Sequence, residues 1–240
     1  MRTVVFGIRT AKEILRDPLS VIFGAGFPIV LLAMLSMIQR SIPVPLFEPE
    51  QLAPGIAVFS LAFLCLFTAS LVAKDRAGCL LMRLRTTRMT AANFILGYTV
   101  PMLPIAFLQL TVTYGVALIL GLSWSPRILA AIAAAFPIAI FHISLGVLCG
   151  CCLQERQVGG LCGALLTNVS AWLSGAWFDV KLVGGAFESL AYSLPFVNAV
   201  DCGRNILDGK WETQALLIPC IYAAAALLAA VVVARKRLHA

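Results

Sequence analysis

The ionisable side chains that could do chemistry gather in one short stretch between two apolar runs. Residues 73–88 carry five basic side chains and one acid, namely Lys74, Asp75, Arg76, Arg83, Arg85 and Arg88. Leu80 and Leu84 lie four residues apart, so a helical turn would place both on one face beside the arginines. An apolar ridge flanked by positive charge suits docking against a groove of another protein. The alternative is attraction to anionic lipid headgroups, which needs no protein partner.

The cysteines are the second group with possible chemistry. Among the eight, Cys149, Cys151 and Cys152 lie closest together, and Cys149 and Cys152 share a helix face. Structural zinc takes four ligands, and no His, Asp or further Cys cluster supplies a second ligand pair. We therefore expect soft side chains packed between helices, with no metal site and no redox function. Cys202 is expected in an outer loop, where it has no partner for a disulfide.

Three polar side chains lie within the apolar runs and are candidates for a substrate path: Gln109, His142 and Asn168. Polar groups inside a bilayer are costly and often mark function. Hydrogen bonding between helices is the simpler explanation for each, and we favour it. No carboxylate lies within a predicted span, which argues against a carrier driven by protons or sodium.

The composition places these residues in a membrane. The chain is 61% hydrophobic and 12% charged, whereas a soluble domain is about one-quarter charged. Its apolar runs are continuous over about 20 residues, which favours transmembrane helices over the short alternating strands of a barrel. We predict one all-α membrane domain over residues 1–240, with six transmembrane helices at residues 19–38, 52–73, 93–120, 128–153, 158–178 and 215–234.

The distribution of positive charge predicts the orientation. Five of the 18 Lys and Arg residues fall on one side of the predicted spans, and the other thirteen fall on the side that holds both termini; the five are Arg40, Arg127, Lys181, Arg204 and Lys210. Both termini are therefore expected in the cytoplasm of a cell whose plasma or inner membrane holds the chain. The net charge of +7 is explained by topology, so we infer no nucleic-acid partner.

Two further segments have patterns of their own. Residues 1–17 predict an amphipathic helix in the cytoplasmic interface, with an apolar face of Val4, Ile8, Ala11 and Leu15 and a charged face of Arg9, Lys12, Glu13 and Arg16. Residues 179–214, between the fifth and sixth spans, predict two short helices that re-enter the outer leaflet. Pro101 and Pro104 predict a kink or tilt in the third span.

This order of segments resembles the membrane subunit of a type-2 ABC exporter. The resemblance rests on short motifs along nearly the whole chain: Arg16-Asp17-Pro18, Leu52-Ala53-Pro54-Gly55-Ile56, Asp75-Arg76-Ala77-Gly78 with Leu84, Ile95-Leu96-Gly97, Asn168 to Ser174-Gly175, Leu194-Pro195 and Arg204-Asn205-Ile206-Leu207-Asp208-Gly209. The chain departs from the family pattern at Ala77 and Met82, where the family has acids, and at Cys79, where it has Thr. Phe178-Asp179 stands where the family has prolines.

The resemblance implies a permease that pairs with a second protomer, identical or related, and with two ABC ATP-binding subunits. Residues 74–92 would be the cytoplasmic coupling loop, and the contacts to the ATPase would involve Arg9, Arg16, Asp75, Arg76, Gly78, Leu80, Arg83 and Leu84. Phe187, Pro195 and Arg204 would belong to an outer gate. The chain has no G-x-x-x-x-G-K-[ST] loop, so it needs no cofactor itself, and ATP and magnesium would bind the partner subunit.

Two other functions compete with transport. A membrane-embedded enzyme of lipid metabolism would need clustered Asp, His or Arg residues at one interface, and the sequence contains no such cluster. A non-transporting assembly or sensor protein would use the basic loop only to contact a protein or anionic lipid. A nearly charge-free interior favours an amphipathic or lipid-like cargo such as a drug, antibiotic, peptide or lipid.

Overall fold

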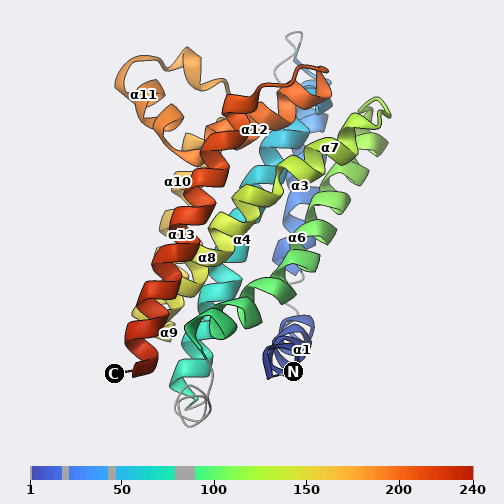
Figure 1. Cartoon of the computed structure of the whole chain (residues 1–240). Coiled ribbons are helices and arrows are strands. Elements are labelled where there is room, and N and C mark those ends of the chain that lie inside the picture. The colour runs from blue at the N-terminus through green and yellow to red at the C-terminus, as the bar shows by residue number, and fades with distance from the viewer. Residues whose placement is uncertain (1, 18–21, 43–46, 79–89, 240) are drawn as a thin grey trace.

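The chain folds into an upright bundle of helices, shown in Figure 1. This computed structural model describes residues 2–17, 22–42, 47–78 and 90–239. Helices make up 85% of the chain, and the described residues contain no β-strand. The predicted all-α class is confirmed.

Among the described residues, four helices are long and apolar enough to cross a membrane. They are α4 (Pro49–Ala77), α6 (Ala91–Leu120), the pair α7 (Arg127–Ala134) and α8 (Phe136–Cys152), and α13 (Thr213–His239). They correspond to the second, third, fourth and sixth predicted spans. Figure 1 shows α6 as one ribbon that bends in its lower part, and Pro101 and Pro104 lie inside this helix.

The first and fifth predicted spans are built from shorter pieces. A π-helical turn, η1 (Ile22–Gly26), leads directly into α3 (Phe27–Gln39). The fifth segment joins α9 (Glu155–Val158), the π-helical η2 (Gly159–Leu166) and α10 (Thr167–Leu173). It ends short of the predicted Phe178 because Gly175, at φ 61°, takes the left-handed conformation that terminates a helix. The count of six spans therefore stays a prediction.

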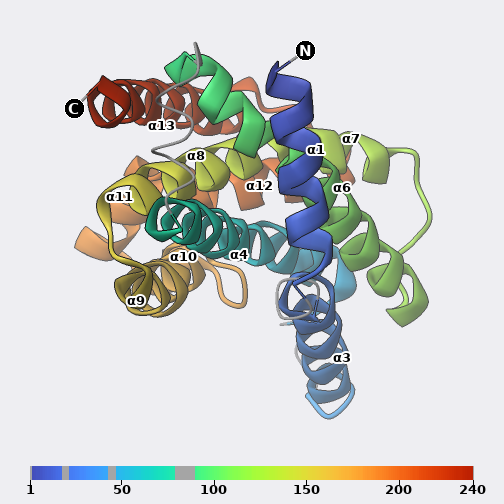
Figure 2. The same ribbon diagram turned by 90° about the horizontal axis from the view of Figure 1, so that it is seen from below.

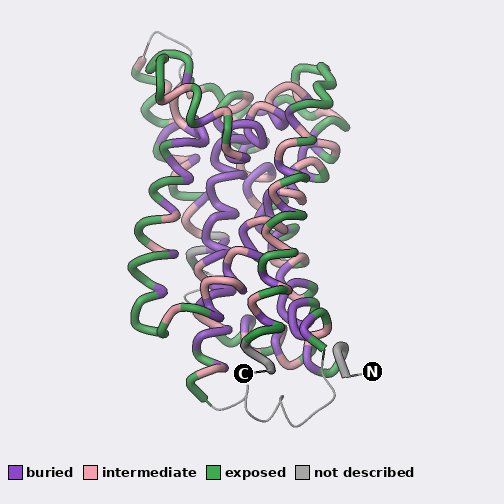
Figure 3. The backbone as a smooth tube through the Cα atoms, turned by 60° about the vertical axis from the view of Figure 1, so that its left-hand side comes forward, coloured by how far each residue is buried: buried purple, intermediate pink, exposed green. Residues whose placement is uncertain are grey.

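Helix α4 forms the centre of the bundle, and most of its side chains are buried. It packs most extensively against α8, because Gly146 and Gly150 remove the side chains that would separate the two backbones. A Cβ on Gly146 would lie 2.6 Å from the carbonyl oxygen of Cys65, and one on Gly150 would lie 2.6 Å from Cβ of Val72. Figure 3 shows this buried centre surrounded by helices with exposed outer faces.

The apolar side chains exposed on the outer helices face away from the bundle. On α6 and α13 they include Leu96, Val100, Phe107, Leu108, Ile119, Leu217, Ile221, Leu228 and Val232. Exposed apolar surface of this extent is unfavourable in water. It is the expected surface of a multi-pass membrane protein, whose outer face contacts lipid.

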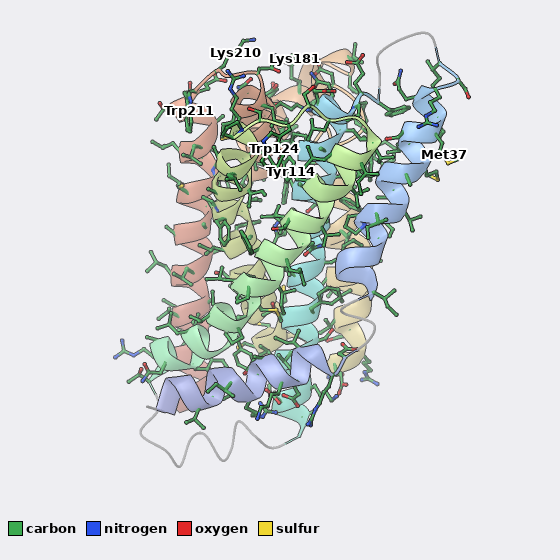
Figure 4. The ribbon with its side chains drawn as sticks, turned by 90° about the vertical axis from the view of Figure 1, so that its right-hand side faces the viewer. Met37, Tyr114, Trp124, Lys181, Lys210 and Trp211 are labelled. Atoms are coloured by element: carbon green, nitrogen blue, oxygen red, sulfur yellow. The ribbon has the colours of Figure 1, made fainter. Side chains whose placement is uncertain are left out.

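The two ends of the bundle are closed by different elements. Helix α1 (Arg2–Leu15) lies across the end that holds both chain termini (Figures 2 and 4). The opposite end carries η3 (Val180–Leu182), α11 (Gly185–Ser193) and α12 (Pro195–Leu207). Figure 4 places Lys181 and Lys210 at that opposite end.

Candidate functional site

Helix α1 is held on α6 by an aromatic side chain that fits over a glycine. The ring of Phe6 lies where a Cβ on Gly97 would come within 2.1 Å of its Cδ1 atom. The same ring meets Tyr98 edge-on, with centroids 5.0 Å apart, and stacks on Phe94 at 6.3 Å. Because glycine has no side chain, the two helices can approach closely at this point.

The face of α1 that packs on the bundle is the one that carries Phe6. Phe6, Thr10 and Ile14, spaced four residues apart, are buried against the bundle, whereas Ile8 of the predicted apolar face is 52% exposed. The side chains of Val4 and Leu15 lie outside the described residues. The fit of Phe6 over Gly97 explains why this face meets α6, and the placement of the other face in a membrane interface stays a prediction.

A buried carboxylate joins three elements beside this contact. Arg9 of α1 donates two hydrogen bonds to Asp75 of α4, from Nη1 to Oδ2 at 2.8 Å and from Nη2 to Oδ1 at 2.6 Å. The Tyr98 hydroxyl of α6 donates to the same Oδ2 atom at 2.7 Å. Asp75 is 5% exposed and Tyr98 is fully buried. The hydrogen bonds to Asp75 raise the pKa of Arg9 above its ordinary value, so the guanidinium stays charged.

Asp75 and Arg76 belong to a helix rather than to the loop in which the sequence placed them. Helix α4 continues through Ala77, and the backbone N–H of Gly78 then donates to the carbonyl of Lys74 at 2.8 Å as the helix ends. Asp75 therefore lies in the last turn of a long apolar helix, two residues beyond the predicted span at residues 52–73. Arg9 satisfies it electrostatically from outside the helix.

Arg76 connects α4 to the end of α8. Its Nη1 atom donates to the carbonyl of Cys151 at 2.6 Å, and its Nη2 atom donates to the carbonyl of Leu153. The last carbonyls of a helix lack partners within the helix and carry partial negative charge. The guanidinium of Arg76 donates hydrogen bonds to these carbonyls and also carries the opposite charge. Arg76 therefore fixes the relative position of α4 and α8.

The other predicted coupling residues lie around or beyond this network. Arg16, just after α1, is exposed and lines a cavity of about 300 Å³ together with Glu13, Asp17, Lys74 and Glu155. Leu80, Arg83 and Leu84 lie outside the described residues. The described residues on either side are Gly78, which follows α4, and Thr90, whose hydroxyl accepts a hydrogen bond from the backbone N–H of Asn93 at the start of α6.

The three residues of the predicted substrate path are not gathered at one place. Gln109 is buried and donates to the carbonyl of Ser60 on α4 at 2.7 Å. The Nδ1 atom of buried His142 lies 2.9 Å from the carbonyl of Ile138, one turn earlier in α8. Asn168 is exposed on α10 and donates to the carbonyl of Ala164. Each contact is of the kind expected for hydrogen bonding within and between helices.

At the opposite end, Arg204 ties three segments together. Its Nε atom donates to the carbonyl of Gln51 at 3.1 Å and its Nη2 atom to the carbonyl of Gly175 at 2.9 Å. Asp201 lies 3.7 Å from its Nη1 atom. Burial lowers the pKa of Arg204 and raises the pKa of Asp201, because both charged forms lose solvation. Arg204 thus joins α12 to the start of α4 and the end of the fifth segment.

The remaining residues of the predicted outer gate lie near this arginine. Pro195 begins α12 and is buried, and Phe187 of α11 packs on Phe178 with ring centroids 6.4 Å apart. A cavity of about 650 Å³ opens beside Arg204, lined by five acidic side chains and two basic ones: Glu48, Asp179, Asp201, Asp208, Glu212, Lys181 and Arg204. Cys202, expected in an open loop, is buried in α12, and burial raises its pKa to about 11.

Sequence patterns did not predict two residues of the network around Asp75, nor one cluster of cysteines. Phe6 and Tyr98 belong to no recognisable sequence pattern, although the neighbouring Gly97 is part of the Ile95-Leu96-Gly97 motif on which the family resemblance partly rests. Of the two cysteines that share a helix face, Cys152 is exposed, while Cys149 lies with Cys65 and Cys162, and the sulfurs of these last three are within 4.8 Å of one another. A sequence pattern shows which residues share a face of one helix. It gives no signal that cysteines from three different helices lie close together.

Residues 2–207 match the family model described as ABC-2 type transporter. The chain belongs to the ABC-2 type transporter family. The match runs from α1 to the last residue of α12 and so includes the Arg9–Asp75–Tyr98 network and Arg204. This ABC-2 protein is accordingly a membrane permease subunit, a transport component that is not itself an ATPase, and its family implies an ABC ATP-binding partner. No curated protein matched the chain.

Proposed function

We propose that this permease subunit forms one half of the membrane domain of an ATP-driven exporter. It pairs with a second protomer and with two ATP-binding subunits, which hold the ATP and magnesium. The chain crosses the plasma or inner membrane six times, with both termini in the cytoplasm. The cargo is amphipathic or lipid-like and leaves from the cytoplasm or the inner leaflet.

The observation that carries this proposal, together with the family, is the network around Asp75. Arg9, Asp75 and Tyr98 connect α1, α4 and α6 in the last turn of α4, a few residues before the predicted docking ridge of Leu80 and Leu84 in the sequence. A force applied to that ridge or to α1 reaches the central helix α4 through short, charge-assisted hydrogen bonds. Arg76 passes the same displacement on to α8. Rigid-body tilting of these helices is one of the common ways in which proteins open and close a path.

At the end of the bundle opposite α1, helix α12 would respond to a tilt of α4. Arg204 joins α12 to the start of α4 and to the turn at Gly175, so a tilt of α4 changes the distances that these hydrogen bonds need. Phe187 and Pro195 lie on the helices that move with it. We infer that this outer layer, re-entering the leaflet, is the gate through which cargo leaves.

The cargo class rests on the side chains of the bundle. Its interior is apolar apart from isolated groups such as Gln109 and His142, which already bond to backbone carbonyls. A polyanionic cargo would need unpaired cations along its path. An amphipathic molecule needs only an apolar route and a polar exit, such as the charged cavity beside Arg204.

The experiment that tests the proposal removes the docking ridge and leaves its charge unchanged. In the variant Leu80→Ser/Leu84→Ser, the ATP-binding subunit should no longer co-purify, or its ATP hydrolysis should no longer depend on the permease. The matched control is Leu182→Ser/Val183→Ser, which changes two apolar residues that are 80% and 58% exposed at the other end of the bundle. We expect the control to keep its ATPase.

The outcomes separate the proposal from its rivals. Normal association and export by the double variant would show that this loop does not dock the ATPase. If no ATP-binding subunit co-purifies with the unaltered chain, the assembly or sensor function is favoured instead. Turnover of lipid by the purified chain alone would favour the lipid-modifying enzyme.

A further inference from the structure

Three cysteines from three separate helical segments meet inside the bundle. Cys65 comes from the middle of α4, Cys149 from the last turn of α8, and Cys162 from the π-helical segment η2. Their sulfur atoms all lie within 4.8 Å of one another. Cys151, Cys152, Cys202 and Cys220 also belong to the described residues but take no part in this cluster.

The distances suit one ion bound by three sulfurs. With metal–sulfur bonds of about 2.3 Å, three sulfurs at the corners of a triangle around one ion lie about 4.0 Å apart. The cluster therefore needs to contract by less than 1 Å along any edge. A structural zinc ion takes four protein ligands, and the described residues offer a fourth sulfur, imidazole or carboxylate nowhere within this group. Soft thiolate ligands instead select Cu(I).

The surrounding packing holds the cluster together. Gly146 brings the α8 backbone against the carbonyl of Cys65, so the two helices cannot slide apart without opening a void. The carbonyl of Cys162 accepts a hydrogen bond from the Thr167 hydroxyl at 2.9 Å, five residues ahead, within the wide π-helical turn. Such π-turns are frequent at functional sites because they redirect side chains from the ordinary helical spacing.

The environment of the three sulfurs is apolar. Ala69, Ala73 and Val158 are buried beside them, so water is largely excluded. Cys149 is only partly buried and lies one turn from the end of α8. Arg76 holds a positive charge at that same helix end, which partly balances the negative charge of the thiolates.

We propose that Cys65, Cys149 and Cys162 form a three-thiolate site for Cu(I). Each thiol that binds gives up its proton to the solvent, and no electron is transferred because copper stays Cu(I). The ion would join α4, α8 and the fifth segment, and this site stands independently of the export proposal.

The test measures Cu(I) binding by purified protein in detergent against a coloured Cu(I) chelator. Cys79, Cys152 and Cys220 are first replaced by serine, so that other thiols do not compete. We expect one Cu(I) per chain, and X-ray absorption should show about three sulfurs near 2.3 Å. Replacing Cys65 or Cys162 by Ala in this background should weaken binding at least about tenfold, because one of three ligands is lost.

Several results would overturn the site. These are unchanged Cu(I) affinity after Cys65→Ala/Cys162→Ala, an absorption spectrum with oxygen or nitrogen as the main ligands, or a disulfide between two of the three cysteines in protein isolated without reductant. The X-ray absorption spectrum is measured on protein that keeps all three cysteines of the cluster. It therefore tests the Cu(I) site even if a substituted variant folds poorly. Cys202→Ala changes a buried cysteine outside the cluster, and it should leave Cu(I) binding unchanged.

Discussion

At the scale of single residues, Asp75 connects three helices, α1, α4 and α6, at the end of the bundle where α1 lies. It is 5% exposed and accepts hydrogen bonds from Arg9 and Tyr98, so its charge is almost entirely removed from water. A carboxylate in such a position is stable only while its partners remain. Its loss would leave the Arg9 guanidinium without its main counter-charge.

Replacing Asp75 with Asn should destabilise the protein by about 3 kcal/mol, the lower end for breaking a buried pair, since Arg9 is partly exposed. The measurement is the melting temperature in detergent. Asp208→Asn is the control, because Asp208 is half-exposed and reaches only Lys210 at 4.0 Å, so it should change stability by less than about 1 kcal/mol. Equal effects of the two variants would contradict the structural role given to Asp75.

Asp201 makes stability depend on pH in the opposite sense from most carboxylates. Burial raises its pKa above the ordinary value of a carboxyl group. The folded state therefore holds this proton more tightly than the unfolded state. The stability that results is fully present below the ordinary carboxyl pKa and is lost as pH rises through the raised one.

The substitution Asp201→Asn should remove the loss of folding stability at higher pH, because the amide stays neutral. Its oxygen can still accept the hydrogen bond from the Tyr192 hydroxyl. The melting temperature of the variant, relative to the unaltered protein, should therefore increase between about pH 4 and pH 7. Thermal melting across that range measures it. A difference that stays constant, or that decreases with pH, would show that Asp201 is not the group responsible.

At the scale of elements, the close contact between α1 and α6 depends on Gly97, which has no side chain where the Phe6 ring lies. Gly97→Ala would place a Cβ 2.1 Å from the Phe6 ring, so α1 must shift, at a cost of roughly 1–3 kcal/mol. Combining it with Phe6→Ala should cost less than the sum of the two single changes, because the clash is then gone. Melting temperature and protease cleavage within α1 report the effect.

Helix α6 itself provides the matched control. A Cβ on Gly115 would meet nothing within 4 Å, so Gly115→Ala should be neutral or stabilising, by up to about 1 kcal/mol. If Gly97→Ala behaves like Gly115→Ala, the close contact with Phe6 does not hold α1 in place.

The elements also show what a sequence can and cannot predict. Helices α4, α6 and α13 were predicted because a long apolar run is a local signal. The break at Ala135 between α7 and α8 was not, although Pro137 in the first turn of α8 explains it, since proline supplies no backbone N–H. The Arg9–Asp75 pair joins residues 66 positions apart, and periodicity within a helix says nothing about such partners.

At the scale of the whole molecule, the basic residues are divided between the two ends of the bundle. The described Lys181 and Lys210 lie at the end of the bundle opposite α1 in Figure 4, and Figure 1 marks both termini at the α1 end, as the prediction of cytoplasmic termini requires. Cys202 lies at the same end but is buried, so it is a poor position for a label. Lys210, whose side chain is 75% exposed, is the better position.

A cysteine placed by Lys210→Cys should react with a membrane-impermeant maleimide in intact cells. Cys152, exposed at the other end, should react only after permeabilisation. Labelling is read by mass spectrometry after proteolysis, with the unaltered chain as the control for the first site. The reverse pattern, in cells shown to be sealed, would invert the topology.

The position of α1 also determines when the protein can finish assembling. Phe6 and Arg9 are synthesised before their partners, since Asp75 follows Arg9 by 66 residues, and Gly97 and Tyr98 come later still. At about 5–20 residues per second, the ribosome needs about 3 to about 18 seconds to deliver those partners. During that time α1 cannot make the contacts that hold it on α4 and α6, so it reaches its final place only after both of these longer helices have been made.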